Sequence, residues 1–388
     1  MPKTVVVLGA GVGGLSTASR LRELLANEDR LILVDRSFEG VLGLSLLWVL
    51  RGWRSAEEVL VHPSKDVLPG IEMVTAEAEA IDVDRRVVTT NAGELSYDAL
   101  VVALGAAINP GRVPGLEEAL DTGVASEFYS LEGATDLHAR LEDLKTGRLV
   151  FVVAGVPFKC PAAPFEAAFL AADLLRSGGA GNEVTIDVFT PDPLPMPVAG
   201  SVVGNALVEM LRSHDIGFHP NKTVARIDAD SQEVIFADGS SEKFDLLAVV
   251  PPHEAPPAVA STGLGPAGWL PVDARTLATK ADGVWGLGDA TVITLPNGKP
   301  LPKAAVFAEG EAEVVAAGVA RYLGRDAPET SFAGEGACYV EVGEGRAAKG
   351  AGNFLDPPAP AVTLQPPSEA FHQEKVDQEA DWLTRWNG

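Results

Sequence analysis

The sequence has few cysteines, few basic residues and no long apolar run. Only two cysteines, Cys160 and Cys338, occur among 388 residues, which excludes a disulfide-stapled secreted domain. The longest apolar run, at residues 41–50, is too short to span a bilayer and is followed by Arg51 and Arg54. Lys and Arg number 30 against 54 Asp and Glu, and the resulting net charge of -24 disfavours nucleic acid and anionic lipid headgroups as partners.

The start of the chain passes from MPK directly into TVVVLGAG, an apolar segment typical of a first strand. We therefore expect no signal peptide and a cytoplasmic protein. The acidic surface suits a basic redox partner, although solubility alone accounts for such a charge. The length is sufficient for two or three domains, and the oligomeric state stays open.

A glycine-rich turn follows the first predicted strand. TVVVLGAGVGGLSTASRLREL and then RLILVDR predict a strand, a turn, a helix and a second strand, the order of a dinucleotide-binding βαβ unit. Gly9 permits the tight turn, Gly11 lets the backbone approach a pyrophosphate, and Gly14 allows close packing of the helix. Asp35 ends the second strand, where an acid can bind the ribose hydroxyls of an adenosine. These residues predict a dinucleotide site.

A second block of the chain repeats this pattern. Residues 72–90 predict short alternating strands, and YDALVVALGA predicts another buried strand. LVFVVAGVP, VTIDVFTP, TVARIDADSQEVIFADGSSEKF and DLLAVVPP then predict the same order again. GVWGLGDAT predicts a strand that ends at Gly288 and Asp289, and PKAAVFAEGEAEVVAAGVARYL predicts a helix after it.

The fold class predicted from this order is α/β, with two Rossmann-like domains and a C-terminal segment. We expect the first domain to comprise residues 1–113 and 241–318 and the second to comprise residues 114–240. Residues 319–388 form the C-terminal segment, which carries Cys338.

The turn after the first strand of the second block departs from the glycine pattern. Pro157, Pro161 and Pro164 remove three backbone N–H donors, and no glycine stands at the expected positions after Gly155. We therefore predict that the second domain binds no nicotinamide nucleotide. Cys160 instead precedes a predicted helix, whose positive end is expected to lower the pKa of the thiol. The residues alone leave open an inert buried thiol, which is the usual state of a lone cysteine.

Three motifs, GAGVGG, YDALVVALGA and VWGLGDA, together resemble the two-dinucleotide-binding-domain flavoprotein family. FKCPAAPFE, DLLAVVPPH and GACYVE further resemble sulfide:quinone oxidoreductases and the flavoprotein subunit of flavocytochrome c sulfide dehydrogenase. The resemblance covers essentially the whole chain. The residues that it implies as FAD ligands are Gly9, Gly11, Gly14, Asp35, Ala103, Gly105, Gly288 and Asp289.

The resemblance also implies a sulfur site, in which one cysteine of the second domain and one of the C-terminal segment face each other at the flavin. Cys160 and Cys338 match those two positions. The segment 36–50 lacks the cysteine that attaches the flavocytochrome flavin, so FAD is expected to be noncovalent. The implied reaction oxidises sulfide to sulfane sulfur or polysulfide, and the electron acceptor is a quinone or a c-type cytochrome.

Two departures bear on the quinone. Some quinone-reducing members carry a third cysteine, and none occurs here between Asp35 and Cys160. Membrane-bound members end in amphipathic helices, of which EKVDQEADWLTRWNG is a poor version. Peripheral contact with the inner face of a membrane therefore stays an open expectation.

Other residues are weaker candidates. Lys303 is expected to neutralise the N1 side of reduced flavin, with an exposed lysine near a helix end as the alternative. His253 is a candidate proton relay and Glu166 a candidate base, but a structural turn histidine and an ordinary acid in a first helical turn are the preferred interpretations. The aromatic candidates for an acceptor pocket, with core packing as the alternative, are Trp48, Trp53 and Phe354.

Two other functions compete with sulfide oxidation. A type II NADH:quinone reductase shares the fold and motifs but needs a glycine loop in the second domain. A redox-linked binding subunit would await a haem partner, and because the chain has no CxxCH motif, any haem must come from another chain.

Overall fold

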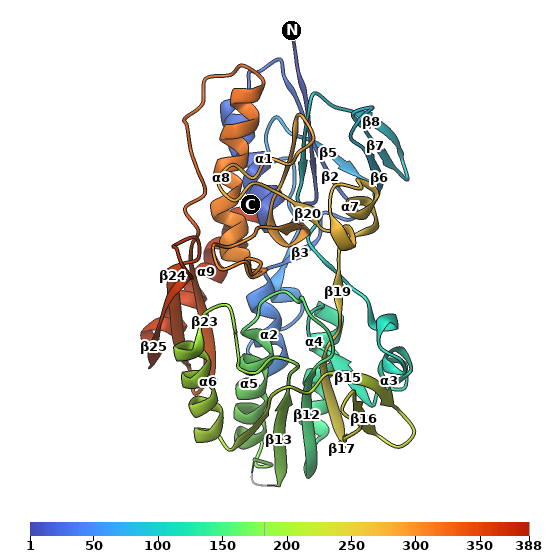
Figure 1. Ribbon diagram of the computed structural model, residues 1–388, viewed down its shortest axis with the longest axis vertical. Helices are drawn as coiled ribbons and strands as arrows, with labels where there is room; N and C mark the ends of the chain where they lie inside the picture. The colour runs from blue at the N-terminus through green and yellow to red at the C-terminus, as the bar shows by residue number, and fades with distance from the viewer. Residues whose placement is uncertain (182, 388) are drawn as a thin grey trace.

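Parallel β-sheets form the centres of two lobes that lie one above the other (Figure 1). The computed structural model describes residues 1–181 and 183–387. The expected α/β fold with two Rossmann-like units is confirmed, since each lobe is a five-stranded parallel sheet covered on both faces.

The sheet of the first lobe has the strand order β21-β9-β1-β2-β5. Its strands are β1 (Thr4–Leu8), β2 (Arg30–Asp35), β5 (Glu72–Thr75), β9 (Ala99–Val102) and β21 (Val284–Gly286). Val5 and Val7 of β1 pack against helices α1 (Val12–Leu24) and α8 (Ala305–Tyr322). The alternate residues face a hairpin layer and a short helix, namely β6 (Ala78–Asp82), β7 (Val87–Thr90), β8 (Gly93–Ser96) and α7 (Pro257–Ser261).

The sheet of the second lobe repeats this arrangement, with the strand order β11-β18-β12-β13-β14. Its strands are β11 (Ala125–Glu127), β12 (Gly147–Val153), β13 (Val184–Phe189), β14 (Ile216–His219) and β18 (Leu246–Val250). One face packs on helices, and the other on a hairpin layer, as in the first lobe. The covering elements are α3 (Leu116–Asp121), α4 (Leu131–Asp143), α5 (Ala163–Ser177), α6 (Ser201–Ser213), β15 (Val224–Asp228), β16 (Glu233–Phe236) and β17 (Ser241–Lys243).

Two segments cross the expected domain boundaries. β18 pairs with β12 in the second sheet, so the boundary expected at residue 241 is too early, and the chain returns to the first lobe only after Val250. Helix α2 (Gly43–Arg51) belongs to the N-terminal segment but packs against α4 and α5 of the second lobe. Its run of six buried residues, 45–50, explains the placement, because so apolar a helix needs a core on more than one side.

The C-terminal segment bridges the two lobes beside the junction between them (Figure 1). It consists of an antiparallel sheet, β23 (Glu335–Gly343), β24 (Arg346–Asn353) and β25 (Ala361–Ser368), and of helix α9 (Glu369–Asn387). Trp382 and Trp386 of α9 are buried in the core of the first lobe. Within the described ranges, no helix combines the length and apolarity that crossing a bilayer requires.

The remaining elements are short and lie near the junction or in loops. The strands are β3 (Gly40–Val41), β4 (Leu60–Val61), β10 (Ala107–Ile108), β19 (His253–Glu254), β20 (Leu270–Pro271) and β22 (Thr291–Val292). The 3-10 turns are η1 (Glu57–Val59), η2 (Pro110–Arg112), η3 (Pro266–Gly268) and η4 (Gly288–Ala290).

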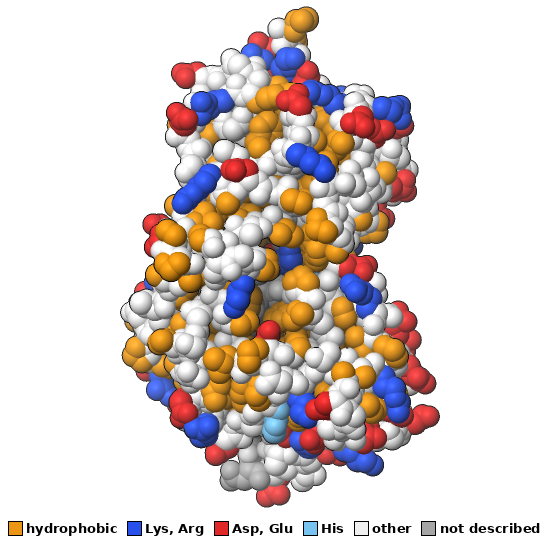
Figure 2. Space-filling model, in the orientation of Figure 1, with side chains coloured by type: hydrophobic (Ala, Val, Ile, Leu, Met, Phe, Trp, Pro, Cys, Tyr) orange, Lys and Arg blue, Asp and Glu red, His pale blue; other side chains and the backbone are white. Residues whose placement is uncertain are grey.

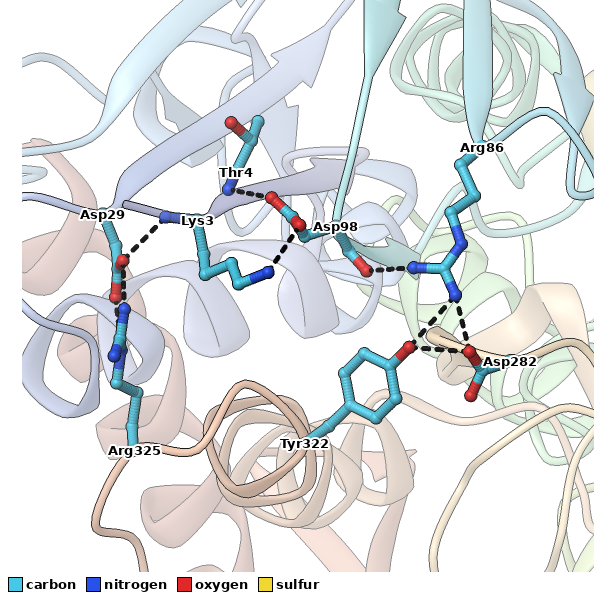
Figure 3. A network of polar contacts seen from close by, with 8 residues as sticks. All are labelled: Lys3, Thr4, Asp29, Arg86, Asp98, Asp282, Tyr322 and Arg325. Atoms are coloured by element: carbon cyan, nitrogen blue, oxygen red, sulfur yellow. Dashed lines mark hydrogen bonds and ion pairs between the residues drawn. The ribbon is translucent and has the colours of Figure 1, made fainter. Parts of the chain in front are cut away.

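A polar network fastens the first lobe where β1 begins and α8 ends (Figure 3). The buried carboxylate of Asp29 accepts hydrogen bonds from the Arg325 guanidinium and, at 2.9 Å, from the backbone N–H of Lys3. The Arg325 guanidinium therefore lowers the pKa of Asp29. Arg86 forms a second ion pair with Asp282. The Asp29–Arg325 pair attaches the segment after α8 to the loop after α1, and so links the two helices that cover the sheet.

Candidate active site

The turn after β1 and the first turn of α1 each contain a glycine at which a side chain has no room. Gly9 has a φ of +96°, and a Cβ there would lie 2.4 Å from the carbonyl oxygen of Ala103. A Cβ on Gly14 would lie 1.8 Å from the oxygen of Gly9. Gly11 faces open space at the start of α1, and no side chain caps that helix end. The open helix terminus is suited to a pyrophosphate.

Asp35 holds this turn to the end of β2. One carboxylate oxygen accepts from the N–H of Ala10 at 2.8 Å, and the other accepts from the N–H groups of Ser37 and Phe38 at 3.0 Å each. The oxygen that accepts from Ala10 has a second lone pair, so the side chain retains the capacity to bind a ribose hydroxyl. That role remains a prediction.

The other predicted flavin ligands lie at the same edge of the first sheet. Ala103 and Gly105 follow β9, and Gly288 and Asp289 follow β21, its parallel neighbour in the sheet. Burial raises the pKa of Asp289, while the charges of Lys159 and Lys303 oppose the shift. The strand ends therefore bring together all the predicted ligands of the first lobe, and the close glycines and the open helix terminus fit a dinucleotide.

Glu311 is a buried acid at this edge that the sequence motifs did not indicate. Its Oε2 accepts a hydrogen bond from the backbone N–H of Gly288 at 2.6 Å, and its side chain is 1% exposed. Burial raises its pKa to about 7. The sequence carried no clear signal for it, because Glu309 and Glu313 flank it in α8 and both are exposed.

Lys303 is buried at the junction of the lobes, so the alternative of an exposed lysine is wrong. Its Nζ donates to the carbonyl oxygens of Asp289 at 2.6 Å and Thr291 at 3.0 Å. The ammonium also lies 3.7 Å from the ring centroid of Trp269. Burial lowers the pKa of Lys303 to about 8, which leaves the side chain able to exchange a proton near neutral pH.

Cys160 lies where the second lobe touches the first. Its backbone N–H donates to the carbonyl oxygen of Lys303 at 2.7 Å. The backbone of the preceding residue, Lys159, forms an isolated parallel β-bridge with Lys303. Cys160 has a φ of +53°, a conformation that is uncommon for residues other than glycine. In the second lobe, the turn that corresponds to the predicted phosphate-binding turn of the first lobe is therefore bonded to the other lobe and carries a thiol.

The two cysteines line one cavity between the lobes. Cys338 lies in β23 opposite Gly350, and both thiols are free. The cavity has a volume of about 650 Å³ and opens on the face shown in Figure 2, where the surface is hollowed between the lobes. Its lining is largely apolar and includes Phe158, Phe165, Trp269, Phe307, Phe354 and Leu364.

The expectation that the helix end lowers the pKa of the Cys160 thiol is wrong. Burial raises the pKa of Cys160 to about 12 and that of Cys338 to about 11. The charge of Glu166 raises both pKa values further, whereas Lys375 lowers both. Cys160 precedes the first residue of α5, Ala163, by three positions, and removal from water outweighs the effect of that helix end.

The structure does not agree with the interpretation of Glu166 as an ordinary acid in the first turn of a helix. Glu166 is 2% exposed and accepts a hydrogen bond from the ammonium of Lys375, which comes from α9. Burial raises the pKa of Glu166 to about 7. No sequence motif indicates Lys375, although it shares one helical face with Glu379, Trp382 and Trp386.

The remaining candidates are divided between the core and the cavity. His253 is 2% exposed, its Nδ1 bonds the oxygen of Pro251 at 2.9 Å, and burial lowers its pKa to about 4, which agrees with a structural role. Trp48 and Trp53 pack around α2 and do not line the cavity, so their assignment to an acceptor pocket is wrong. Phe354 does line it.

Comparison with known proteins places this site in a family context. The chain is 28% identical over 313 residues to the mitochondrial sulfide:quinone oxidoreductase of Mus musculus. The aligned region covers 76% of this chain and 66% of that protein. It is 25% identical over 345 residues, 84% of each chain, to the type II NADH:quinone oxidoreductase of Staphylococcus aureus. The chain thus spans just under two thirds of the mouse protein.

The fold has a match among solved structures. The sulfide:quinone oxidoreductase from the hyperthermophilic bacterium Aquifex aeolicus superposes with a TM-score of 0.87 at 23% identity, covering 99% of this chain and 91% of that one. The family model of the pyridine nucleotide-disulphide oxidoreductases matches residues 3–312. The chain therefore belongs to the pyridine nucleotide-disulphide oxidoreductase family.

Proposed function

We propose that the chain is a FAD-dependent sulfide oxidoreductase that uses Cys160 and Cys338 and passes electrons to a quinone. One observation carries this proposal: two free thiols from different parts of the chain line a single cavity next to the predicted flavin ligands. The similarity to sulfide:quinone oxidoreductases supports the same reaction. Neither a core packing role nor a nucleotide site accounts for thiols at both walls of one cavity.

The residues of the first lobe would hold FAD without a covalent bond, because no cysteine lies near them in the segment 36–50. Gly11 and the α1 terminus would meet the pyrophosphate, Asp35 the adenosine ribose, and Asp289 the ribityl chain. Lys303, buried beside Asp289, would balance negative charge on a reduced cofactor.

The sulfur steps use this chain's own residues. With the two thiols joined as a disulfide, hydrosulfide attacks one sulfur, an S–S bond forms to it, and the other cysteine leaves as a thiolate. A second hydrosulfide takes the sulfane sulfur away from the persulfide and leaves a thiol. The remaining thiol and thiolate lose two electrons and one proton when the bridge re-forms, and bound FAD would supply the two-electron acceptor.

The acceptor is proposed from the shape and polarity of the cavity. Its apolar lining and the exposed side chain of Val156 at its wall suit the ring and tail of a quinone. A c-type cytochrome is the second candidate, favoured by the net charge of -24, which attracts cationic proteins. Peripheral membrane contact would bring a lipid-soluble quinone to the cavity.

NADH oxidation is disfavoured by the turn after β12. Pro157, Pro161 and Pro164 lack the N–H groups that bind a pyrophosphate, and the adjacent backbone of Cys160 is bonded to the first lobe. The similarity to a type II NADH:quinone oxidoreductase is accounted for by the fold that the two classes share.

The test is anaerobic mixing of the purified protein with sulfide and, separately, with NADH or NADPH, while the flavin absorbance is recorded. We expect sulfide to bleach the flavin rapidly and the nicotinamide nucleotides to leave it oxidised. Acid precipitation is expected to release FAD into the supernatant. Fast bleaching by NADH would instead assign the chain to the NADH:quinone reductases, and flavin retained in the pellet would contradict noncovalent binding.

A further inference from the structure

A buried cluster of charged side chains lies behind the two cysteines. Glu166 of α5, Glu341 of β23 and Lys375 of α9 are each 2% exposed or less, and none of them lines the cavity. The Lys375 ammonium is bonded to Glu166 and lies 3.9 Å from Oε1 of Glu341. Cys338 and Glu341 point to opposite faces of β23, because successive residues of a strand alternate.

The second carboxylate of the cluster has partners of its own. Glu341 Oε1 lies 2.9 Å from Nδ1 of His372 and accepts a hydrogen bond from Nε1 of Trp48 at 3.2 Å. Because Glu341 has these partners, Lys375 is the cation that balances the charge of Glu166. Leaving a carboxylate this deeply buried without a partner is costly.

Other charged groups on and beside α9 form ion pairs outside this cluster. Arg54 binds the buried Glu379 at 2.8 Å, and Lys349 binds Glu374 on the outer side of the helix. On the neighbouring helices, Arg51 binds Asp173 at 2.6 Å. The charges that reach the sulfurs from behind are therefore those of Glu166 and Lys375, and these act on both thiols with opposite sign.

We propose that Lys375 is a positioning residue of the sulfur site: by pairing with Glu166 it offsets the carboxylate charge at both cysteines, so that one sulfur can leave the disulfide as a thiolate. This inference rests on the proposed function. When hydrosulfide attacks the bridge, its negative charge moves to the departing cysteine sulfur, and a nearby ammonium stabilises that charge. The C-terminal helix thus contributes to a reaction whose cysteines lie outside it.

The test measures thiol reactivity without sulfide and without turnover. Because the chain has two cysteines, Cys338→Ser leaves Cys160 as the single thiol, and Cys160→Ser leaves Cys338. In each background, reduced protein is alkylated with iodoacetamide at a fixed alkaline pH, where the rate follows the thiolate fraction. Lys375→Met removes the charge at similar length, and Lys375→Arg is the matched control that keeps it.

We expect Lys375→Met to slow alkylation of both thiols about tenfold, the equivalent of one pKa unit, and Lys375→Arg to change it less than about twofold. If Lys375→Met alone does not fold, Glu166→Gln is compared with Glu166→Gln/Lys375→Met. Both variants lack the carboxylate at position 166, so removal of Lys375 leaves no unpaired charge there. Alkylation then slows when Lys375 is replaced. Equal rates in the folded pair overturn the proposal.

Anaerobic sulfide reduction of the wild type and of Lys375→Met, both with Cys160 and Cys338 intact, separates this inference from the proposed function. If wild-type flavin is not bleached by sulfide, the proposed function fails whatever the alkylation rates are. If the wild type is bleached, while Lys375→Met matches it in both alkylation and the pH profile of bleaching, only the role of Lys375 fails.

Discussion

At the scale of single residues, the two thiols are the part of the molecule on which the proposed reaction depends most directly. We expect Cys160→Ser and Cys338→Ser each to slow sulfide-dependent flavin bleaching by about 10³-fold or more, because a serine hydroxyl forms no persulfide. The hydroxyl is close to the thiol in size, so the free energy of unfolding changes by about 1 kcal/mol. Stopped-flow absorbance measures the first effect, and denaturant unfolding measures the second.

The control for these variants is flavin content, which is expected to stay at the wild-type level in both. Near-normal bleaching in either variant would show that its cysteine only fills space. That outcome would return Cys160 or Cys338 to the inert thiol that remains the commonest state of a lone cysteine.

Glu311 gives the molecule a pH-dependent stability. Burial raises its pKa from the ordinary 4.5 to about 7, so folding binds a proton between these values and stability falls as pH rises from 4.5 to 7. We expect Glu311→Gln to match the wild type near pH 4 and to exceed its free energy of unfolding by up to about 3 kcal/mol at pH 8. Urea unfolding across this range measures the difference.

The matched control is Glu313→Gln, at an exposed position of the same helix. Its stability is expected to follow that of the wild type at every pH. If Glu311→Gln shows the wild-type pH dependence instead, the acid is ionised without cost in the folded protein.

Site residues that follow strands were easier to predict from the sequence than site residues that reach the site through tertiary packing. Gly9 and Asp289 follow apolar strands and Gly14 lies in the first turn of the helix after such a strand, where parallel sheets place ligand-binding groups, and motif spacing therefore indicated them. Glu311 and Lys375 come from the interiors of helices, and their burial depends on elements more than 20 residues away in the sequence. Helical periodicity alone indicates one face of a helix but not what covers it.

At the scale of elements, the βαβ turn offers a pair of glycines with different steric surroundings. Gly14→Ala places a methyl group 1.8 Å from the oxygen of Gly9, so we expect the turn to shift, with a loss of about 1–3 kcal/mol in unfolding free energy and of flavin binding. Gly11→Ala meets no protein atom within 4 Å and is expected to keep the fold while weakening FAD binding. Flavin titration and thermal unfolding of the flavin-free proteins distinguish the two.

Tight FAD binding by Gly11→Ala would show that the pyrophosphate does not approach that residue. Full stability of Gly14→Ala would show that the turn tolerates the displacement.

The order of helices and strands could be predicted from the sequence, but which sheet or lobe each of them joins was harder to predict. The repeated order of strands and helices correctly predicted two similar lobes, because the hydrophobic period and the glycine turns are local signals. The strand DLLAVVPP was predicted, but its sheet was not, since β18 and a strand of the first lobe are equally apolar. In the same way, nothing local in α2 shows that it packs in the second lobe.

At the scale of the whole molecule, the net charge of -24 distinguishes the two candidate acceptors. At saturating sulfide we expect turnover with a short-chain quinone to be independent of salt, because a neutral acceptor feels no long-range field. Turnover with a cationic c-type cytochrome is expected to fall about tenfold or more as ionic strength rises from 0.01 to 0.15 M, with the Debye length shrinking from about 30 to 8 Å. Steady-state rates over that range measure both.

A quinone rate above the cytochrome rate at 0.15 M supports the proposed acceptor. The reverse order at that ionic strength would make a cytochrome the acceptor and leave the sulfur chemistry unchanged.

The interleaved sheets also set an order of completion during synthesis on the ribosome. The second sheet has all five strands once Val250 has emerged, whereas the first lacks β21 until Gly286 has followed. The second lobe can therefore fold co-translationally while β9 of the first sheet still has an unpaired edge. An unpaired strand edge is prone to association with other nascent chains. Trp386 reaches the core of the first lobe later still, so the cavity walls and the flavin lobe mature last.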